Sequence, residues 1–437
     1  MLMRISVIFG TVVLWLFVLC ASQVALAAIP PITVTSLSGG SNDGTGCTLR
    51  DAIQAVNTAM PVGQCIAGTA GSVVNTITLQ VRAISFAHID SHSAGAFLPA
   101  LVAGRSLNIY GSSLTRTNLS ASAMCGQSSG RFLEVHTGAA LLVADVDFSC
   151  GFPLPSDALG GIGGAIANFG TFYLVRSHLF QNSAYTSHLT GAVYNHGSAI
   201  YTGPDAQFSA NDVTFDSNVG GGALYVDTDP GNGSATIVNC AFVANQGSAI
   251  HNVGSLTVTN ATFLNNDSVP GPGFSSQLVG AISNTAPGTL DLSFASIVNT
   301  SIAKTYFTEL DIGPNSTARI KSSLFSTPPA SALTTNCSVS SSATVSWSGV
   351  SISSDATCAG GSNLINTNPG VDGALADNGG PTQTLKLLSG SPAIHIDSDC
   401  LDTSATPVTT DQRGYSRPSS RCDAGAYEDT VFANGFE

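Results

Sequence analysis

The stretch Ser248–Asn266, SAIHNVGSLTVTNATFLNN, contains two strand-like segments joined by an Asn-x-Gly turn. Its apolar anchors are Leu256, Val258 and Phe263, and Asn260 precedes the Phe by three residues. The same frame recurs about every 30 residues along the chain. Its copies are Leu141, Val143, Asp145 and Phe148; Tyr173, Val175, Ser177 and Phe180; Phe208, Ala210, Asp212 and Phe215; Ala235, Ile237, Asn239 and Phe242; Leu290, Leu292 and Ile297; and Ala318, Ile320, Ser322 and Phe325.

A second repeated motif accompanies the first. Gly-Ala-Ile or a near copy occurs at 164–166, 191–193, 222–224, 248–250 and 280–282, and Asn follows two residues later at 168, 195, 252 and 284. A repeat of this length indicates a solenoid, a propeller or an array. Each copy alternates with a period of two and is too short for a four-stranded propeller blade. The pattern therefore predicts a parallel β-helix with apolar columns inside and structural Asn columns at its turns.

Residues 1–27 have the pattern of a secretory signal peptide. Arg4 precedes the apolar run Ile5–Cys20, and Ala25-Leu26-Ala27 supplies a small-residue cleavage site. No other stretch approaches the ~20 apolar residues that are needed to span a bilayer. We therefore expect a secreted or cell-surface protein without a transmembrane span in the mature chain.

The composition of the mature chain limits the classes of ligand that it is expected to bind. Only 9% of the residues are charged, so Ser, Thr and Asn must supply most of the polar surface, as is typical of extracellular β proteins. Removal of Arg4 with the signal peptide changes the formal net charge from −13 to −14. A surface of this charge repels nucleic acid and anionic polysaccharides.

Nine of the ten cysteines lie beyond the signal peptide, where an exported chain is oxidised. Proximity in sequence suggests four disulfides, although spacing alone does not fix the connectivity. The candidate pairs are Cys47–Cys65, Cys125–Cys150, Cys337–Cys358 and Cys400–Cys422. Cys240 is left over, and its place in a strand of the wall predicts a buried, inert thiol.

Cys47–Asn57 carries a helical pattern, with Leu49, Ile53 and Val56 on one face and Thr48 with Asp51 as a capping box. An exported solenoid needs its first coil covered, and residues 28–65 are expected to form this N-terminal cap. The β-helix is predicted over 66–361, with Pro328–Gly361 as a loop or an irregular coil. Residues 362–428 are rich in turn signals and are expected to cap the last coil, and residues 429–437 form a tail.

A resemblance to known proteins concerns both ends of the mature chain. Cys47-Thr48-Leu49-Arg50-Asp51-Ala52-Ile53 resembles the CSLREA motif of bacterial exported proteins, with Thr48 in place of Ser and Asp51 in place of Glu. The C-terminal block is similar to the choice-of-anchor Q domain. The matching segments are 375–382, 390–394, 410–414 and 422–428. This resemblance implies a right-handed, pectin-lyase-like β-helix on an exported, often surface-attached protein, and it supplies no catalytic residues.

One segment resembles part of an enzyme motif. Arg319-Ile320-Lys321 is similar to the Arg-Ile-Lys motif of polygalacturonases, whose Asn-Thr-Asp, Asp-Asp and Gly-His-Gly motifs do not occur in this sequence. The repeat frame instead predicts that Arg319 and Lys321 lie on a solvated face beside inward-pointing Ile320.

The carboxylates do not form a recognisable catalytic pair. Asp145 and Asp212 fall in one column with Asn239 and Asn260, which favours hydrogen bonding over acid–base catalysis. No catalytic residue, metal site or cofactor is predicted.

An aromatic strip is the candidate binding site. Aligning the coils places Ala167, Tyr194, Tyr225, His251 and Ser283 in one outward column. Tyr194, Tyr225 and His251 would then form an exposed strip that can stack on sugar rings or contact a protein. The histidine of Asn195-His196-Gly197 lies close to it in sequence. Ordinary surface stacking that favours β structure is the alternative interpretation.

The sequence thus favours a non-enzymatic surface or extracellular role, most concretely adhesion or glycan binding. The expected partner is a carbohydrate or a cell-surface protein. Two alternatives remain open. The first is a polysaccharide lyase or glycoside hydrolase with a divergent site, and the second is a structural spacer in the envelope.

Overall fold

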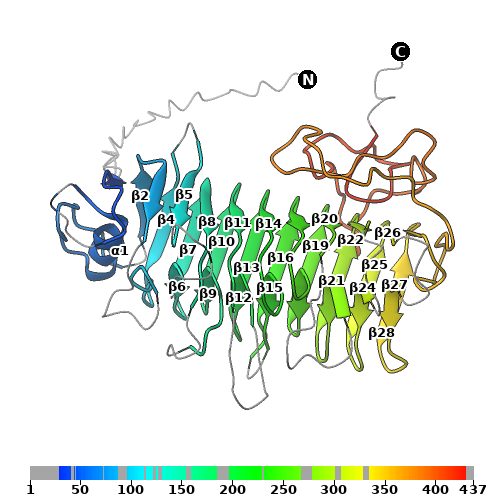
Figure 1. Cartoon of the computed structure of the whole chain (residues 1–437), viewed down its shortest axis with the longest axis horizontal. Coiled ribbons are helices and arrows are strands. Elements are labelled where there is room, and N and C mark those ends of the chain that lie inside the picture. Colours follow the sequence, from blue (N-terminus) through cyan, green and yellow to red (C-terminus); the bar gives the residue numbers. More distant parts are fainter. Residues whose placement is uncertain are drawn as a thin grey trace, which may run out of the picture. The chain divides into compact units, whose positions relative to one another are not determined.

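A computed structural model describes residues 29–429 except 41–43, 45, 72, 87–95, 113–114, 122–124, 126–129, 154–158, 185–195, 229–230, 267–277, 301–306 and 328–333. The predicted signal peptide and most of the predicted tail lie outside the described residues. Pro31–Glu437 form one compact unit (Figure 1), and the following account concerns the described part of it. No helix in that part is long and apolar enough to cross a membrane.

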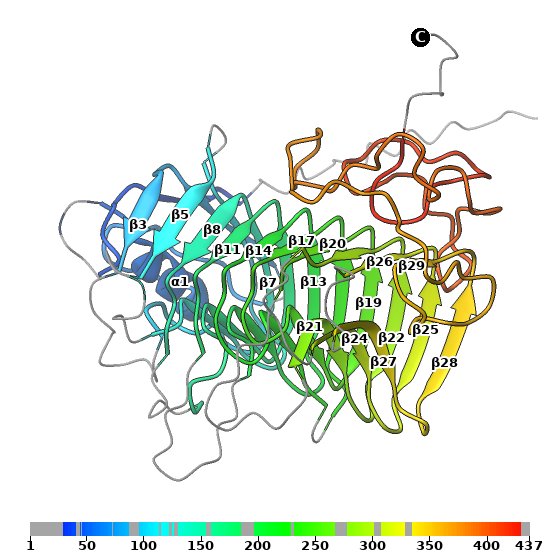
Figure 2. The same cartoon turned by 45° about the vertical axis from the view of Figure 1, so that its right-hand side comes forward.

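The described residues form three all-parallel sheets and a single helix, and each complete coil contributes one strand to each sheet (Figures 1 and 2). Sheet A contains β1 (Ile32–Val34), β2 (Val74–Leu79), β4 (Ser106–Tyr110), β7 (Ala140–Ala144), β10 (Thr171–Val175), β13 (Gln207–Asn211), β16 (Ser234–Val238), β19 (Ser255–Thr259), β22 (Thr289–Ser293), β25 (Thr317–Lys321) and β28 (Thr344–Ser348).

Sheet B contains β3 (Ala83–Ser85), β5 (Thr117–Ser120), β8 (Val146–Ser149), β11 (His178–Phe180), β14 (Thr214–Asp216), β17 (Ala241–Val243), β20 (Thr262–Leu264), β23 (Ser296–Val298), β26 (Leu324–Ser326) and β29 (Ile352–Ser353). Sheet C contains β6 (Leu133–Val135), β9 (Ile166–Asn168), β12 (Ile200–Thr202), β15 (Leu224–Val226), β18 (Ile250–Asn252), β21 (Leu278–Asn284), β24 (Phe307–Ile312) and β27 (Thr334–Val339). The predicted parallel β-helix is therefore confirmed.

The core consists of inward-pointing residues that stack from coil to coil. Phe215, Phe242 and Phe263 are register partners in sheet B, and all three are buried. Their rings stack nearly parallel, with centroids 4.5 and 4.9 Å apart. Burial of each such side chain contributes roughly 1.5–3 kcal/mol, so the repeated column is a main source of stability.

The register of one coil differs from the prediction. Phe172, Leu174 and Leu179 point inward and pair with the inward residues of the next coil, whereas Tyr173 is 45% exposed. The expected anchors Tyr173, Val175 and Phe180 are therefore wrong by one position. The segment Thr171–Val175 reads TFYLV, and four apolar residues in five leave no alternation from which to choose a face.

The turns between sheets A and B adopt the left-handed conformation, which Asn and Asp tolerate better than most residues do. Positive φ angles occur at Asp145, Arg176, Asp212, Asn239, Asn260, Phe294 and Ser322. The second predicted column is also structural, because Asn168, Asn252 and Asn284 are buried and donate to backbone carbonyls of neighbouring coils. A further ladder was not predicted: Asn182, Asn218, Asn245 and Asn266 are buried and bond one another in succession.

The N-terminal cap agrees with the sequence pattern. Helix α1 (Leu49–Thr58) packs against β1 and β2 and buries Leu49, Ile53 and Val56. The side chain of Thr48 accepts a hydrogen bond from the Asp51 amide at 3.1 Å, as in a capping box. The disulfide Cys47–Cys65 closes this cap, and the other three predicted pairs are also formed. Cys240 is free and buried.

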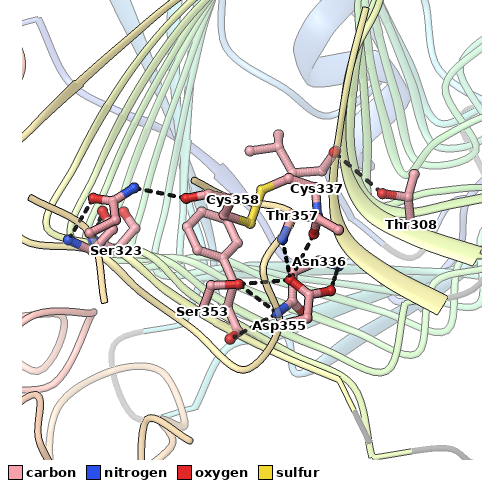
Figure 3. Close-up of a disulfide and its surroundings, with 12 residues drawn as sticks. Thr308, Ser323, Asn336, Cys337, Ser353, Asp355, Thr357 and Cys358 are labelled. Atoms are coloured by element: carbon pink, nitrogen blue, oxygen red, sulfur yellow. Dashed lines mark hydrogen bonds between the residues drawn. A yellow bond between two sulfur atoms is a disulfide. The ribbon is translucent and has the colours of Figure 1, made fainter. Parts of the chain in front are cut away.

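The last coil is regular, and the segment that follows it is held by a disulfide and by hydrogen bonds to Asp355. Residues 334–353 form β27, β28 and β29, a complete coil where a loop or an irregular coil was expected. Figure 3 shows how Asp355 organises the segment that follows, beside the disulfide Cys337–Cys358. The Asp355 carboxylate accepts hydrogen bonds from Asn336, Ser353 and Thr357.

The sequence suggested that the C-terminal block caps the last coil. Its first residues do pair with that coil, because the Leu364 amide donates to the Ser351 carbonyl and the Ser353 amide donates to the Leu364 carbonyl. The rest of the block packs along the side of the β-helix, over the outer face of sheet B. Leu324 and Ile352 contact Leu387 and Ala393, and a second cluster joins Leu385 to the sheet. The cause is a set of outward-pointing apolar residues on sheet B, Leu264, Val298 and Leu324, which are buried under the block.

Candidate functional site

The candidate site is a row of stacked rings on the outer face of sheet C, which we call the aromatic ladder. It consists of Tyr201, His196, Tyr225 and His251. Register pairing places Tyr201, Tyr225 and His251 opposite one another on β12, β15 and β18. The His196 ring stacks on Tyr225 with centroids 4.2 Å apart, and Tyr225 stacks on His251 at 4.8 Å. Tyr201 lies 6.0 Å from Tyr225.

The predicted member Tyr194 lies outside the described residues. Its expected register position, between Ala167 and Tyr225, is occupied by Tyr201. The reason is that residues 190–203 contain two similar segments, TGAVYNHG and GSAIYTG. Both match the repeat, so the sequence offers no basis for choosing between them, whereas the backbone pairing selects the second. Tyr225 and His251 lie where they were predicted.

The ladder presents ring edges and not ring faces. Because Tyr225 stacks on both His196 and His251, the faces of the Tyr225 ring are occupied within the ladder. Tyr201 is buried at 5% exposure, while Tyr225 and His251 are partly exposed. A ligand would therefore meet the hydroxyl edge of Tyr225 and the imidazole edge of His251, in contrast to the face-on sugar stacking that the sequence suggested.

An acidic side chain fixes one end of the ladder. The Tyr201 hydroxyl donates to the Asp227 carboxylate at 2.6 Å, and the Thr228 amide donates to the same carboxylate. No group of three or more potential metal ligands occurs among the described residues.

The ladder is uncharged near neutral pH. Burial raises the pKa of Tyr201 and Tyr225, with a further contribution from Asp227, so both hydroxyls remain donors. Burial lowers the pKa of His196, and burial together with His196 lowers the pKa of His251 to about 4. Both imidazoles are therefore neutral and each offers one donor and one acceptor nitrogen. Such a surface suits an uncharged, hydroxyl-rich ligand.

The depressed pKa of His251 leads to a prediction about pH. In the unfolded chain His251 binds a proton below about pH 6.5, but in the folded chain only below about pH 4. The folded state therefore loses stability as pH falls from 6.5 to 4, and the loss levels off below pH 4. His251→Phe keeps a ring in the ladder and removes the titration.

We expect the difference in unfolding free energy between wild type and His251→Phe to change with pH only in this window. Urea unfolding at several pH values measures it. A difference that is constant from pH 7 to pH 4 would contradict the burial of a neutral imidazole.

The two basic residues of the Arg-Ile-Lys segment each form an ion pair with an aspartate of the chain. Arg319 is exposed and forms a bidentate ion pair with Asp291 of the preceding coil. Lys321 is buried, not solvated as expected, because the C-terminal block covers it and Asp399 pairs with it at 2.5 Å. Ile320 points inward, as predicted.

The acidic column behaves as a structural one. Asp145 forms a bidentate ion pair with Arg176 at 2.8 and 2.6 Å. Asp212 lies at the equivalent turn two coils after that of Asp145, and its carboxylate accepts a hydrogen bond from the Asn211 side chain. Burial raises the pKa of Asp212. The turn of Arg176 lies between the turns of Asp145 and Asp212, so this column contains an ion pair between successive coils, which supports its structural interpretation.

Comparisons with protein-family models, with curated proteins and with solved structures find no match to this chain. The similarity to the CSLREA motif and to the choice-of-anchor Q domain therefore remains a prediction from the sequence. The function has to be argued from the site itself.

Proposed function

We propose that this protein is an exported, non-enzymatic binding protein of the cell surface or extracellular space, and that it holds neutral glycans along the outer face of sheet C. The observation that carries the proposal is the aromatic ladder, an uncharged row of hydroxyl and imidazole edges on consecutive coils. The four disulfides support the proposed location, because disulfides form and persist in oxidising compartments outside the cytosol.

The mechanism would be repeated weak binding by a rigid surface. Parallel strands fix the spacing of the ladder at about 4.8 Å per coil, so its edges do not have to be ordered when a ligand binds. A single hydrogen bond contributes only about 0.5–1.5 kcal/mol, but several contacts to one polymer act together. The formal net charge, −13 for the full sequence and −14 without Arg4 of the predicted signal peptide, disfavours acidic polysaccharides and leaves neutral ones as the expected ligands.

The ladder can be tested with substitutions that remove its edge groups. We expect Tyr225→Ala combined with His251→Ala to weaken binding to a neutral polysaccharide by at least about tenfold, which corresponds to about 1.4 kcal/mol. Tyr225→Phe removes the hydroxyl and leaves the stack, and it should weaken binding by a smaller factor. Depletion of the protein from solution by insoluble cellulose, mannan or chitin measures the affinity.

Tyr173→Ala is the matched control, because Tyr173 is an exposed tyrosine on sheet A, away from the ladder. It should bind as the wild type does. Equal affinity of the ladder variant and the Tyr173 variant for every polysaccharide would contradict the proposal.

A further inference from the structure

A second candidate site is a cleft of about 400 Å³ where the C-terminal block meets the β-helix. Its floor is formed by the residues that follow successive strands of sheet B. These are Asn299 after β23, Thr327 after β26 and Ser354 after β29, together with Val298 at the end of β23. The start of the C-terminal block supplies the opposite wall, with Asn366, Asn368 and Asp372.

The lining of this cleft is polar but almost uncharged. Among the lining residues that the structure describes, Asp372 carries the only formal charge, and the polar groups are amides and hydroxyls. Amide side chains both donate and accept hydrogen bonds, as sugar hydroxyls do, and a carboxylate can accept from two neighbouring hydroxyls. An anionic ligand is disfavoured, because none of these residues is a cation.

Two polar side chains in the cleft are available to a ligand. Among the described residues, no donor bonds the carboxylate of Asp372, which is half-buried. The Asn368 side-chain oxygen accepts the Gly370 amide at 2.9 Å, while no acceptor among the described residues takes its NH₂ group. An acceptor-only group and a donor thus lie in the same wall, over the apolar Val298.

The backbone holds these groups in place. The Asp372 amide donates to the Lys386 carbonyl at 2.9 Å, and the Asn366 amide donates to the Asp355 carbonyl at 3.0 Å. On the floor, the Ser354 hydroxyl accepts the Thr327 amide at 3.1 Å. The wall is therefore tied to the disulfide-closed segment of the last coil, and the cleft is formed without a ligand.

We propose that this cleft binds a neutral saccharide, as a pocket that is separate from the aromatic ladder. The choice of ligand class rests on the proposed function, whereas the location rests on the cleft alone. The cleft would hold one or two sugar units by their hydroxyls, while the ladder contacts a longer chain.

Gly373 allows the cleft to be blocked directly. Its backbone does not adopt a positive φ, and an added Cβ would lie 3.6 Å from Thr300 Cγ2, an ordinary contact. Gly373→Tyr therefore introduces a large side chain at the rim without backbone strain. Asp372→Asn keeps the shape and removes the charge. Asp377→Asn, an exposed carboxylate of the same block outside the cleft, is the matched control.

The experiment is isothermal titration calorimetry of the mature chain with short cello-, malto-, manno- and chito-oligosaccharides, and with trigalacturonate as an acidic comparison. We expect at least one neutral oligosaccharide to bind. Gly373→Tyr should weaken it by at least about tenfold and Asp372→Asn by a smaller factor, while Asp377→Asn has little effect. Circular dichroism confirms that each variant is folded.

Several outcomes would overturn the inference. The first is that no neutral oligosaccharide binds. The second is that a neutral oligosaccharide binds and Gly373→Tyr does not change its affinity. The third is that trigalacturonate binds more tightly than the neutral oligosaccharides do. Stabilisation by calcium alone that Asp372→Asn abolishes would identify a cation site instead. If Tyr225→Ala impairs binding of polymers while Gly373→Tyr changes nothing, the cleft inference fails and the proposed function stands. If Gly373→Tyr impairs binding while Tyr225→Ala leaves the binding of polymers unchanged, the ladder proposal fails.

Discussion

Phe242→Asp is expected to abolish the native fold. Phe242 is fully buried between Phe215 and Phe263, whose ring centroids lie 4.5 and 4.9 Å from its own. Removal of a buried Phe alone costs about 3–5 kcal/mol, and a buried carboxylate without a partner costs more. The total stability of a native protein is about 5–15 kcal/mol, so the variant should be largely unfolded. The circular dichroism spectrum and the yield of soluble protein measure this effect.

The neighbouring residue provides the control. Val243 follows Phe242 in β17 and points outward, where it is partly exposed. Val243→Asp introduces the same carboxylate one position away and should fold with little change in unfolding midpoint. If both variants fold equally well, the inward column is not the core that the structure shows.

Arg417→Met is expected to destabilise the docking of the C-terminal block by about 3–5 kcal/mol. The guanidinium is fully buried and donates to the Glu428 carboxylate at 2.7 Å, the Gly425 carbonyl at 2.7 Å and the Asn260 side chain at 3.2 Å. It also lies 4.4 Å from the ring centroid of Phe294. Without Arg417, Glu428 remains buried with no cation to pair with in this arrangement, and burial already raises its pKa to about 7.

The exposed pair Arg319–Asp291 is the matched control for this substitution. Arg319→Met removes a bidentate partner of a carboxylate at the surface and should cost less than about 1 kcal/mol. Urea unfolding gives the free energies, and limited proteolysis reports whether residues 362–429 are released first. Equal effects of the two substitutions would show that the block does not depend on its buried ion pair.

The β-helix could be predicted because its signal is repeated. Phe215, Phe242 and Phe263 each sit at the same place in an alternating segment, so independent copies agree on one register. The error at Phe172 and Tyr173 occurred where both faces of a strand are apolar. The disulfides were predictable for a different reason, because each pair is separated by only 18–25 residues.

The position of the C-terminal block could not be predicted, because it depends on contacts between residues far apart in sequence. Leu324 and Val298 look like ordinary wall residues until the block is seen to cover them. Lys321 appeared solvated because its partner Asp399 lies 78 residues further along the chain. The cleft was missed for the same reason, since it exists only between the coils and the block.

The candidate site was predicted in part. Tyr225 and His251 were found from the column alone. The stacking of His196 on Tyr225 depends on the conformation of the segment before β12, which the repeat does not predict. The orientation of the rings was also beyond the sequence. It changes the expected chemistry from stacking on ring faces to hydrogen bonding with ring edges.

The most direct test of a non-enzymatic glycan-binding role is to incubate the mature protein with neutral and acidic polysaccharides and to measure two quantities in each sample. These are the fraction of protein bound and the appearance of new reducing ends or unsaturated products. We predict retention by at least one neutral polysaccharide, loss of that retention in the Tyr225→Ala, His251→Ala variant, and no new chain ends. Turnover of any polysaccharide, or the absence of binding to every neutral one, would contradict the proposal.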